Sequence, residues 1–193
     1  MMRGRLRLLV ALAAAVLLFS GFFGGDKSKE EIQKARQEIQ KMARETLQML
    51  YRYAPESKRM IKKAYGYAVF SNVGVNLFLL STENGSGLAH NNRTGKEIYM
   101  KMFSGGVGVG LGVKDFRIVF IFDNKKVFDN FVNSGWEANA QADAAAKAEQ
   151  KGAAASAAVT VAPGVHLYKL TKNGLALQAT IQGTKYWKDD ELN

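Results

Sequence analysis

The chain has 193 residues, 47% of them hydrophobic and 23% charged, a balance that is typical of a folded globular domain and excludes wholesale disorder. This length accommodates one domain with a proper core, and not two ordinary domains once a targeting segment is set aside. The formal net charge of +10 favours an anionic partner. Cysteine is absent, which excludes disulfides, thiol chemistry and a cysteine-linked lipid anchor.

The first 25 residues have the pattern of an export signal. Basic residues at Arg3, Arg5 and Arg7 precede an uncharged run from Leu8 to Phe19, the order of a basic and then an apolar signal region. The run is shorter than the roughly 20 residues that span a bilayer, and it only just approaches that length if "GFFGG" is added. We therefore expect export to the periplasm or cell envelope, with residues 1–25 either cleaved or kept as an anchor through residues 8–23.

Residues 26–193 are predicted to form a single domain, whose helical lead-in covers residues 26–64. A long helix is predicted over residues 26–54, because Ser28 and Glu31 match a capping box and Pro55 excludes helical geometry at the residue before it. Its apolar residues recur at alternating steps of three and four, which places them on one helix face. These residues are Ile32, Ala35, Ile39, Met42, Thr46, Met49 and Tyr53.

A second helix is predicted in "PESKRMIKKAYG", with Pro55 as its first residue and Gly66 as its stop. Its inward residues would be Met60, Ile61 and Ala64. The outward residues form a basic cluster, for which two interpretations stay open: a solvated helix face, or a patch for anions or lipid headgroups. The cluster consists of Lys58, Arg59, Lys62 and Lys63.

A sheet-rich core is predicted over residues 67–187, because the apolar period changes from 3.6 to 2. Strands are expected in "YAVFSNVGVNLFLL", with a break near Ser71, and in "EIYMKMF", "FRIVFIF" and "GLALQATIQGTKYW"; turns are expected in "TENGSG" and "NNRTGK". One more helix is expected in "DNKKVFDNFVNSG", capped by Asp123 or Asn124 and stopped by Gly135. Its inward residues would be Val127, Phe128, Phe131 and Val132.

The glycine-rich stretch "MFSGGVGVGLGVKDF" fits neither nucleotide-binding motif. The third glycine of a dinucleotide fingerprint is missing in both registers, and no lysine of a phosphate-binding loop follows. Alternation predicts a strand whose one face carries no side chains and is covered by another protein element or by an acyl chain. The bare face would be formed by Gly106, Gly108, Gly110 and Gly112.

Residues 137–158 are rich in alanine and leave two interpretations open. Alanine content favours a helix, whereas alanine at every second position from Ala138 to Ala148 is the pattern of a strand, with "EQKG" as the turn of a hairpin.

No residue pattern indicates an enzyme, a metal site or a cofactor. His90 and His166 stand far apart without metal-ligand spacing nearby, and Ser86 lacks the outer glycines of a nucleophile elbow. RNA-binding signatures are also missing. We therefore expect a non-enzymatic protein without catalytic, metal-binding or cofactor-binding residues and with no nucleic-acid partner.

Three stretches together resemble the SYLF domain family, a lipid-binding family that also contains a fungal actin-patch protein. They are "YAVFSNVG", "RIVFIFDNKKVFDNFVNSGWEANAQADAAA" and "NGLALQATIQGTKYW". The resemblance covers roughly residues 35–187 and implies an α+β fold in which N-terminal helices pack on a curled antiparallel sheet, rich in glycine and alanine, with one further helix inserted. It also favours the hairpin for residues 137–158.

The resemblance implies affinity for anionic lipid surfaces. Our leading hypothesis is an exported, non-enzymatic envelope protein that binds anionic, phosphoinositide-like membrane surfaces. The alternative is an envelope scaffold that uses the helix over residues 26–54 for a partner or a second copy. The candidate lipid contacts are Lys58, Arg59, Lys62, Lys63, Lys125 and Lys126.

Overall fold

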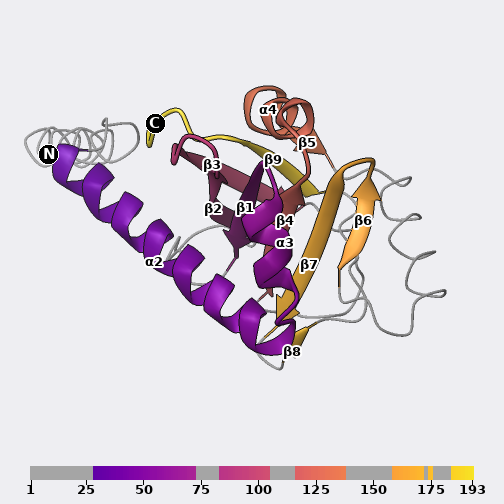
Figure 1. Cartoon of the computed structure of the whole chain (residues 1–193). Helices are drawn as coiled ribbons and strands as arrows, with labels where there is room; N and C mark the ends of the chain where they lie inside the picture. Colours follow the sequence, from indigo (N-terminus) through magenta and orange to yellow (C-terminus); the bar gives the residue numbers. More distant parts are fainter. Residues whose placement is uncertain (1–27, 73–82, 105–115, 138–157, 172–173, 176–183) are drawn as a thin grey trace, which may run out of the picture. The chain divides into compact units, whose positions relative to one another are not determined.

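The computed structural model describes residues 28–72, 83–104, 116–137, 158–171, 174–175 and 184–193. Contacts divide the chain into two units, residues 1–34 and residues 35–193. In the second unit, helices accompany an antiparallel β-sheet (Figure 1), which confirms the predicted α+β class. No helix among the described residues is long and apolar enough to cross a membrane.

Helix α2 (Lys29–Tyr53) begins at the predicted capping box. The Ser28 amide donates to Glu31 Oε2 at 2.7 Å, and the Glu31 amide donates to Ser28 Oγ at 3.2 Å, so each residue satisfies a backbone donor of the other. The buried residues of α2 are Ile39, Ala43, Thr46 and Leu50. The predicted stripe was thus right at Ile39 and Thr46 and wrong at its end, where Tyr53 is 45% exposed.

Helix α3 (Ser57–Lys63) is shorter than predicted. It starts two residues after Pro55, and Ala64 already has extended backbone with ψ 159°. The prediction that Gly66 stops this helix was wrong, because Gly66 is the first residue of strand β1 (Gly66–Ser71). A Cβ at Gly66 would stand 2.6 Å from the ring of Phe128, so this glycine serves ring packing rather than helix termination.

The strands form one sheet with the order β5-β9-β3-β2-β1-β4-β7-β6, and β8 pairs with β7. The strands that follow β1 are β2 (Glu83–Asn91), β3 (Glu97–Ser104), β4 (Phe116–Phe122), β5 (Trp136–Glu137), β6 (Val159–Ala162), β7 (Val165–Thr171), β8 (Gly174–Leu175) and β9 (Thr184–Lys188). Among the described residues, every strand pair is antiparallel. Apolar alternation and buried runs therefore located β1, β3 and β4 correctly.

The predicted turn in "TENGSG" was wrong, whereas the turn in "NNRTGK" is confirmed. Residues 83–87 lie within β2, where Asn84 pairs with Phe103 and Gly85 with Met102. The chain reverses instead between β2 and β3, where Asn91 Oδ1 accepts the amides of Arg93 and Thr94 at 2.8 and 3.1 Å. This Asx-type turn stabilises the connection between the two strands of the hairpin.

One face of the sheet carries an aromatic core and helix α4 (Lys125–Ser134). The predicted helix is confirmed, because Asn124 Oδ1 accepts the Val127 amide at 3.2 Å, Gly135 follows the helix with φ 72°, and Phe128 and Phe131 are buried. The remaining inward predictions agree: Val132 is buried and Val127 is partly buried.

The sheet curls, as the aromatic core shows. Phe70 on β1 and Tyr186 on β9 have ring centroids 4.7 Å apart, although β2 and β3 separate their strands. Gly87 of β2 is paired with Phe70, and a Cβ there would stand 2.2 Å from the Phe70 ring. The ring thus lies on bare backbone, a close approach that only glycine permits.

The other face of the sheet is covered by α2 and α3. Arg117 of β4 donates from Nη1 to Thr46 Oγ1 of α2 at 3.2 Å, and Tyr168 of β7 donates from its hydroxyl to Met60 Sδ of α3 at 3.3 Å. Leu50 is fully buried and Ile61 is 5% exposed. Both faces of the sheet's centre are therefore occupied, as the apolar run in β4 indicated.

Four predictions lie wholly or largely outside the described residues. They are the export signal or anchor over residues 1–25, the bare-faced strand with Gly106, Gly108, Gly110 and Gly112, the alanine-rich segment 137–158, and the strand pair around Gly183.

Candidate functional site

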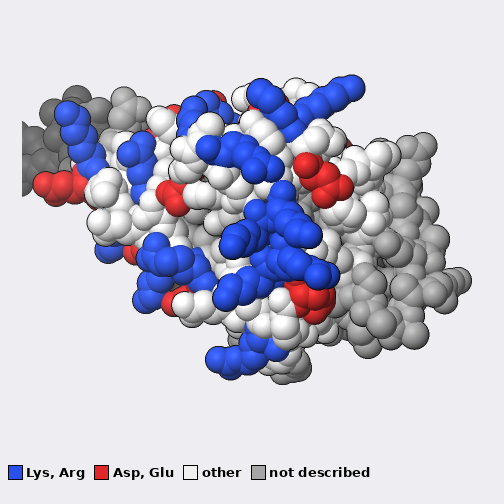
Figure 2. Space-filling model, in the orientation of Figure 1, with Lys and Arg blue, Asp and Glu red and all other residues white. Residues whose placement is uncertain are grey.

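The predicted basic cluster lies on the outer side of α3. The buried residues of α3 are Ser57 and Ile61. All four cations of the cluster are exposed: Lys58, Arg59, Lys62 and Lys63. Figure 2 shows lysine and arginine side chains gathered where Figure 1 has α3. Lys62 lies three and four residues from Arg59 and Lys58, and Lys63 lies four from Arg59, so these pairs are neighbours on the helix surface.

The C-terminal end of α3 is held by the turn between β2 and β3. Asn92 donates from Nδ2 to the carbonyls of Ile61 and Ala64 at 2.7 and 3.1 Å, and its amide donates to the Tyr65 carbonyl at 3.0 Å. These bonds satisfy carbonyls that the helix leaves without intrahelical donors. The turn therefore meets the end of the helix that carries Lys62 and Lys63.

This contact brings two further exposed cations, Arg93 and Lys96, to the basic cluster. The sequence analysis predicted a turn here and assigned these two residues no function, because residues about thirty positions from the helix become its neighbours only through tertiary contacts. The one available signal was the pair of basic residues in "NNRTGK".

The start of α4 reaches the same end of α3. The Tyr65 amide donates to the Phe122 carbonyl at 2.8 Å, and the rings of Tyr65 and Phe128 are 5.7 Å apart. Lys125 and Lys126 are exposed at the first turn of α4. The turn between β2 and β3 and the start of α4 thus meet the end of α3 that carries Lys62 and Lys63, while Lys58 and Arg59 lie in the first turn of α3. We call the four cations of α3, the two turn cations, Lys125 and Lys126 the basic surface.

Lys125 differs from the other cations because it pairs with Asp129 one turn along α4. The hydrogen bond to Asp129 raises the pKa of the fully exposed Lys125 ammonium, and the charge of Asp129 adds to the rise. The pair lowers the net charge that Lys125 offers to an anion. Lys126 and the α3 cations therefore contribute more to the positive potential of the basic surface.

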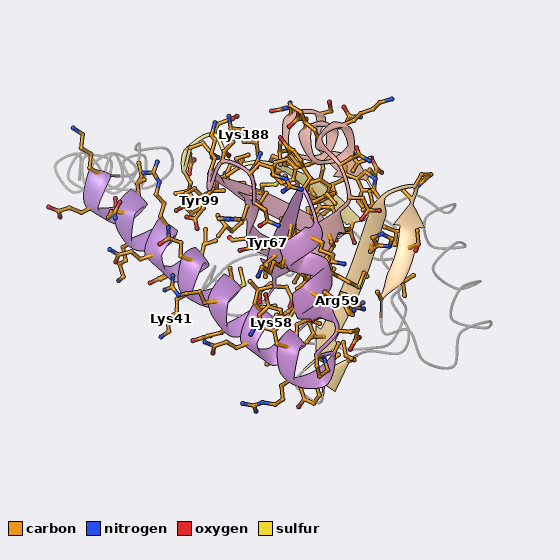
Figure 3. The ribbon with its side chains drawn as sticks, in the orientation of Figure 1. Lys41, Lys58, Arg59, Tyr67, Tyr99 and Lys188 are labelled. Carbon is orange, nitrogen blue, oxygen red and sulfur yellow. The ribbon has the colours of Figure 1, made fainter. Side chains whose placement is uncertain are left out.

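Apart from the basic surface, a set of polar and aromatic side chains lies between α2 and the sheet, where Figure 3 labels Tyr67 and Tyr99. The ring of Tyr67 stacks on that of His90 with centroids 5.1 Å apart, and His90 pairs with Glu97 across β2 and β3. Burial raises the pKa of Tyr67 to about 12, with Tyr51 and Glu97 adding to the rise. Tyr67 is therefore a neutral phenol at physiological pH, packed against the ring of His90.

His166 has partners that the sequence did not reveal. Its Nε2 lies 3.1 Å from Asp123 Oδ2 and its Nδ1 lies 3.2 Å from Thr160 Oγ1, which ties β6 and β7 to the residues just before α4. Among the described residues no group of three or more histidines and acids could hold a metal ion. Because the imidazole spans two strands and a helix start, its arrangement is that of a structural crosslink.

Fold and surface define the chain as an α+β protein with a curled antiparallel sheet and an exposed basic face. No family model matches it. A protein of Aeromonas veronii named Beta cell expansion factor A is 40% identical to it over 159 residues. The match covers 82% of this chain and 59% of the relative, so the chain spans less than two thirds of the relative's length.

Proposed function

We propose that the chain is an exported, non-enzymatic protein of the cell envelope that binds anionic phospholipid surfaces through the basic surface. The observation that carries the proposal is the convergence of exposed cations from α3, the β2–β3 turn and the start of α4. Lipid headgroups present many phosphates in one plane, and such a plane is complementary to a broad set of exposed cations rather than to a pocket.

Two sequence features support binding to anionic phospholipid surfaces. The motifs that resemble the SYLF family imply lipid binding, and the basic and apolar order of residues 1–25 favours export. The net charge of +10 acts in the same direction, because a positive protein is drawn to anionic membranes by long-range attraction.

The expected strength follows from the number of cations. A basic residue near an anionic leaflet contributes about 1 kcal/mol, so the four cations of α3 supply about 4 kcal/mol, close to a thousandfold in the partition constant. Because exposed charges are screened within about 8 Å at physiological ionic strength, binding has to weaken strongly as salt is added.

Vesicle sedimentation tests the proposal. We expect the protein to sediment with vesicles of phosphatidylglycerol and phosphatidylcholine at low salt, to be released at high salt, and to stay in solution with phosphatidylcholine alone. Equal binding to both kinds of vesicle, or binding to neither, contradicts the proposal.

A charge-matched pair of variants tests the location. The first replaces the four α3 cations by glutamine. The control removes four exposed cations elsewhere, two on α2 and two on β9: Lys41, Arg44, Lys185 and Lys188. We expect the α3 variant to lose most of its binding and the control variant to lose much less; equal losses would show that net charge acts without a defined surface.

The alternative, a partner or second copy bound through the stripe of residues 26–54, has less support. Ile39, Ala43, Thr46 and Leu50 at the centre of the stripe are buried within the chain, so the helix would have to leave the sheet to offer them. Light scattering on the full chain tests this alternative, since a strict monomer argues against self-association through α2.

A further inference from the structure

Two large hydrophobic side chains stand out among the described residues because they are exposed. Tyr53, at the end of α2, is 45% exposed and Trp187, on β9, is 40% exposed. Single exposed apolar side chains are common in soluble proteins and need no explanation by themselves. The charges around each of them decide whether it can meet an anionic surface.

Tyr53 lies at the elbow between α2 and α3, where one side of its ring faces the backbone of Gly174 on β8 and the other side is exposed. The Ala54 amide donates to the Leu50 carbonyl at 2.7 Å, and the Ser57 hydroxyl donates to the Ala54 carbonyl at 2.6 Å. Ala54 is 1% exposed and Ser57 is fully buried, so these two residues anchor the elbow from inside. Tyr53 and Pro55 are left on its outer surface.

The elbow continues into the cationic side of α3. Arg52 precedes Tyr53, and Lys58 and Arg59 follow in the first turn of α3, all exposed; Glu56 is the one carboxylate in residues 52–59. Figure 3 shows Lys58 and Arg59 on α3 beside this end of the molecule. An aromatic side chain with a polar tip, set among cations, matches the boundary between headgroups and acyl chains.

Trp187 has the opposite setting. Its neighbours Lys101 and Lys185 are already paired with Asp189 and Glu137, at 3.3 and 3.2 Å. Lys188 follows it, and two further acids, Asp190 and Glu191, come after Asp189. Four carboxylates thus accompany three lysines around Trp187, so attraction to an anionic leaflet is weaker there than at the elbow.

We propose that the elbow around Tyr53 is the part of the chain that enters the headgroup layer of an anionic bilayer, and that Trp187 stays in water. The inference rests on the proposed function and adds the orientation of the bound protein. The side chains of Tyr53 and Pro55 reach below the phosphates, while Arg52, Lys58 and Arg59 remain at their level.

The absence of cysteine allows a direct test with single-cysteine variants of the full chain. Tyr53→Cys and Trp187→Cys are each labelled with a fluorophore whose emission rises in apolar surroundings. Each is then mixed with vesicles of phosphatidylglycerol and phosphatidylcholine, with or without a nitroxide-bearing lipid. We expect the label at position 53 to brighten and to be quenched by the nitroxide lipid, and the label at position 187 to do neither.

Sedimentation of the same samples separates the two proposals. If the protein sediments with the vesicles and neither label responds, or the label at position 187 responds more, the orientation is overturned and the proposed function stands. If the protein does not sediment at all, both are overturned.

Substitutions at Tyr53 give a second measurement that does not depend on a label. The exposed part of this ring corresponds to about a five- to tenfold change in partition constant if it enters the interface. We expect Tyr53→Ser to weaken vesicle binding by that factor, Tyr53→Trp to restore it, and Trp187→Ser to leave it unchanged. Unchanged binding by Tyr53→Ser, with urea unfolding showing all three variants folded, overturns the inference.

Discussion

The substitution Gly87→Ala is expected to destabilise the fold through the contact between β1 and β2. An added Cβ would stand 2.2 Å from Phe70 Cδ1 and 2.6 Å from the Val69 carbonyl oxygen, whereas carbon atoms pack at about 3.5 to 4.0 Å. The Phe70 ring cannot move aside freely, because it is fully buried and lies 4.7 Å from the ring of Tyr186.

The magnitude follows from two opposing effects. Overpacking of this kind costs about 1 to 3 kcal/mol, and the overlap at Gly87 involves backbone as well as side-chain atoms, which places it at the upper end. Replacing glycine by alanine stabilises by about 0.4 to 1 kcal/mol by restricting the unfolded chain. Subtracting the entropic gain from an overpacking cost of about 3 kcal/mol leaves a net loss of about 2 kcal/mol in the free energy of unfolding.

Urea unfolding followed by circular dichroism measures the loss. Ser86→Ala is the matched control, because it lies in the same strand next to Gly87 and adds no atom; its effect should stay within about 0.5 kcal/mol. In the background Phe70→Leu the cost of Gly87→Ala should shrink, since the ring that it meets is gone. If Gly87→Ala is as stable as the wild type, the close packing of Phe70 on β2 is refuted.

Other residues give further predictions. Asn92→Ala should lower the free energy of unfolding by about 1 to 3 kcal/mol, because it leaves the last carbonyls of α3 without donors; urea unfolding checks this, and an unchanged midpoint argues against the contact. Asn124→Ala should cost about 1 kcal/mol through loss of the α4 cap, whereas Asn124→Asp should retain most of the stability. Burial raises the pKa of both Tyr67 and Tyr168 to about 12, above the ordinary tyrosine pKa of about 10. Their contribution to stability is thus complete below about pH 10 and is lost as the pH rises toward about 12. Tyrosinate absorbance, followed as the pH is raised, should show this ionisation near pH 12. The absorbance change should be smaller in Tyr67→Phe.

Sequence patterns predicted the elements whose signals are local. The capping box at Ser28, the Asn124 cap and Gly135 mark helix ends through interactions between residues a few positions apart. Alternation located β3 for the same reason, since each residue of a strand has a face fixed by its own position.

The errors arose where a distant partner decides the structure. Asn84 and Gly85 have the composition of a turn, and their pairing with β3 overrides this local preference. Gly66 suits a helix stop, yet it pairs with Asn91 and Phe122 in the sheet, and the ring of Phe128, 62 positions away in the chain, leaves no room there for a Cβ. Tertiary contacts of this kind leave no periodic trace in a single sequence.

The candidate site was predicted in part. The four cations of α3 and the two at the start of α4 were recognised as basic residues, and the structure brings the start of α4 to the C-terminal end of α3. The contribution of Arg93 and Lys96 could not be derived, because it depends on the Asn92 side chain reaching the α3 carbonyls.

Asn92 of the β2–β3 turn holds the end of α3, so anion binding to the α3 cations is linked to the order of that turn. A helix of seven residues is too short to persist alone in water, so the cations keep their arrangement only while the β2–β3 hairpin is closed. Any anion that binds this arrangement must in turn stabilise the closed hairpin. Bound vesicles should therefore slow amide hydrogen exchange at Asn92 and Gly95, whose amides donate to the carbonyls of Tyr65 and Asn91, so that hydrogen bonds of the protein backbone would report the occupancy of the surface.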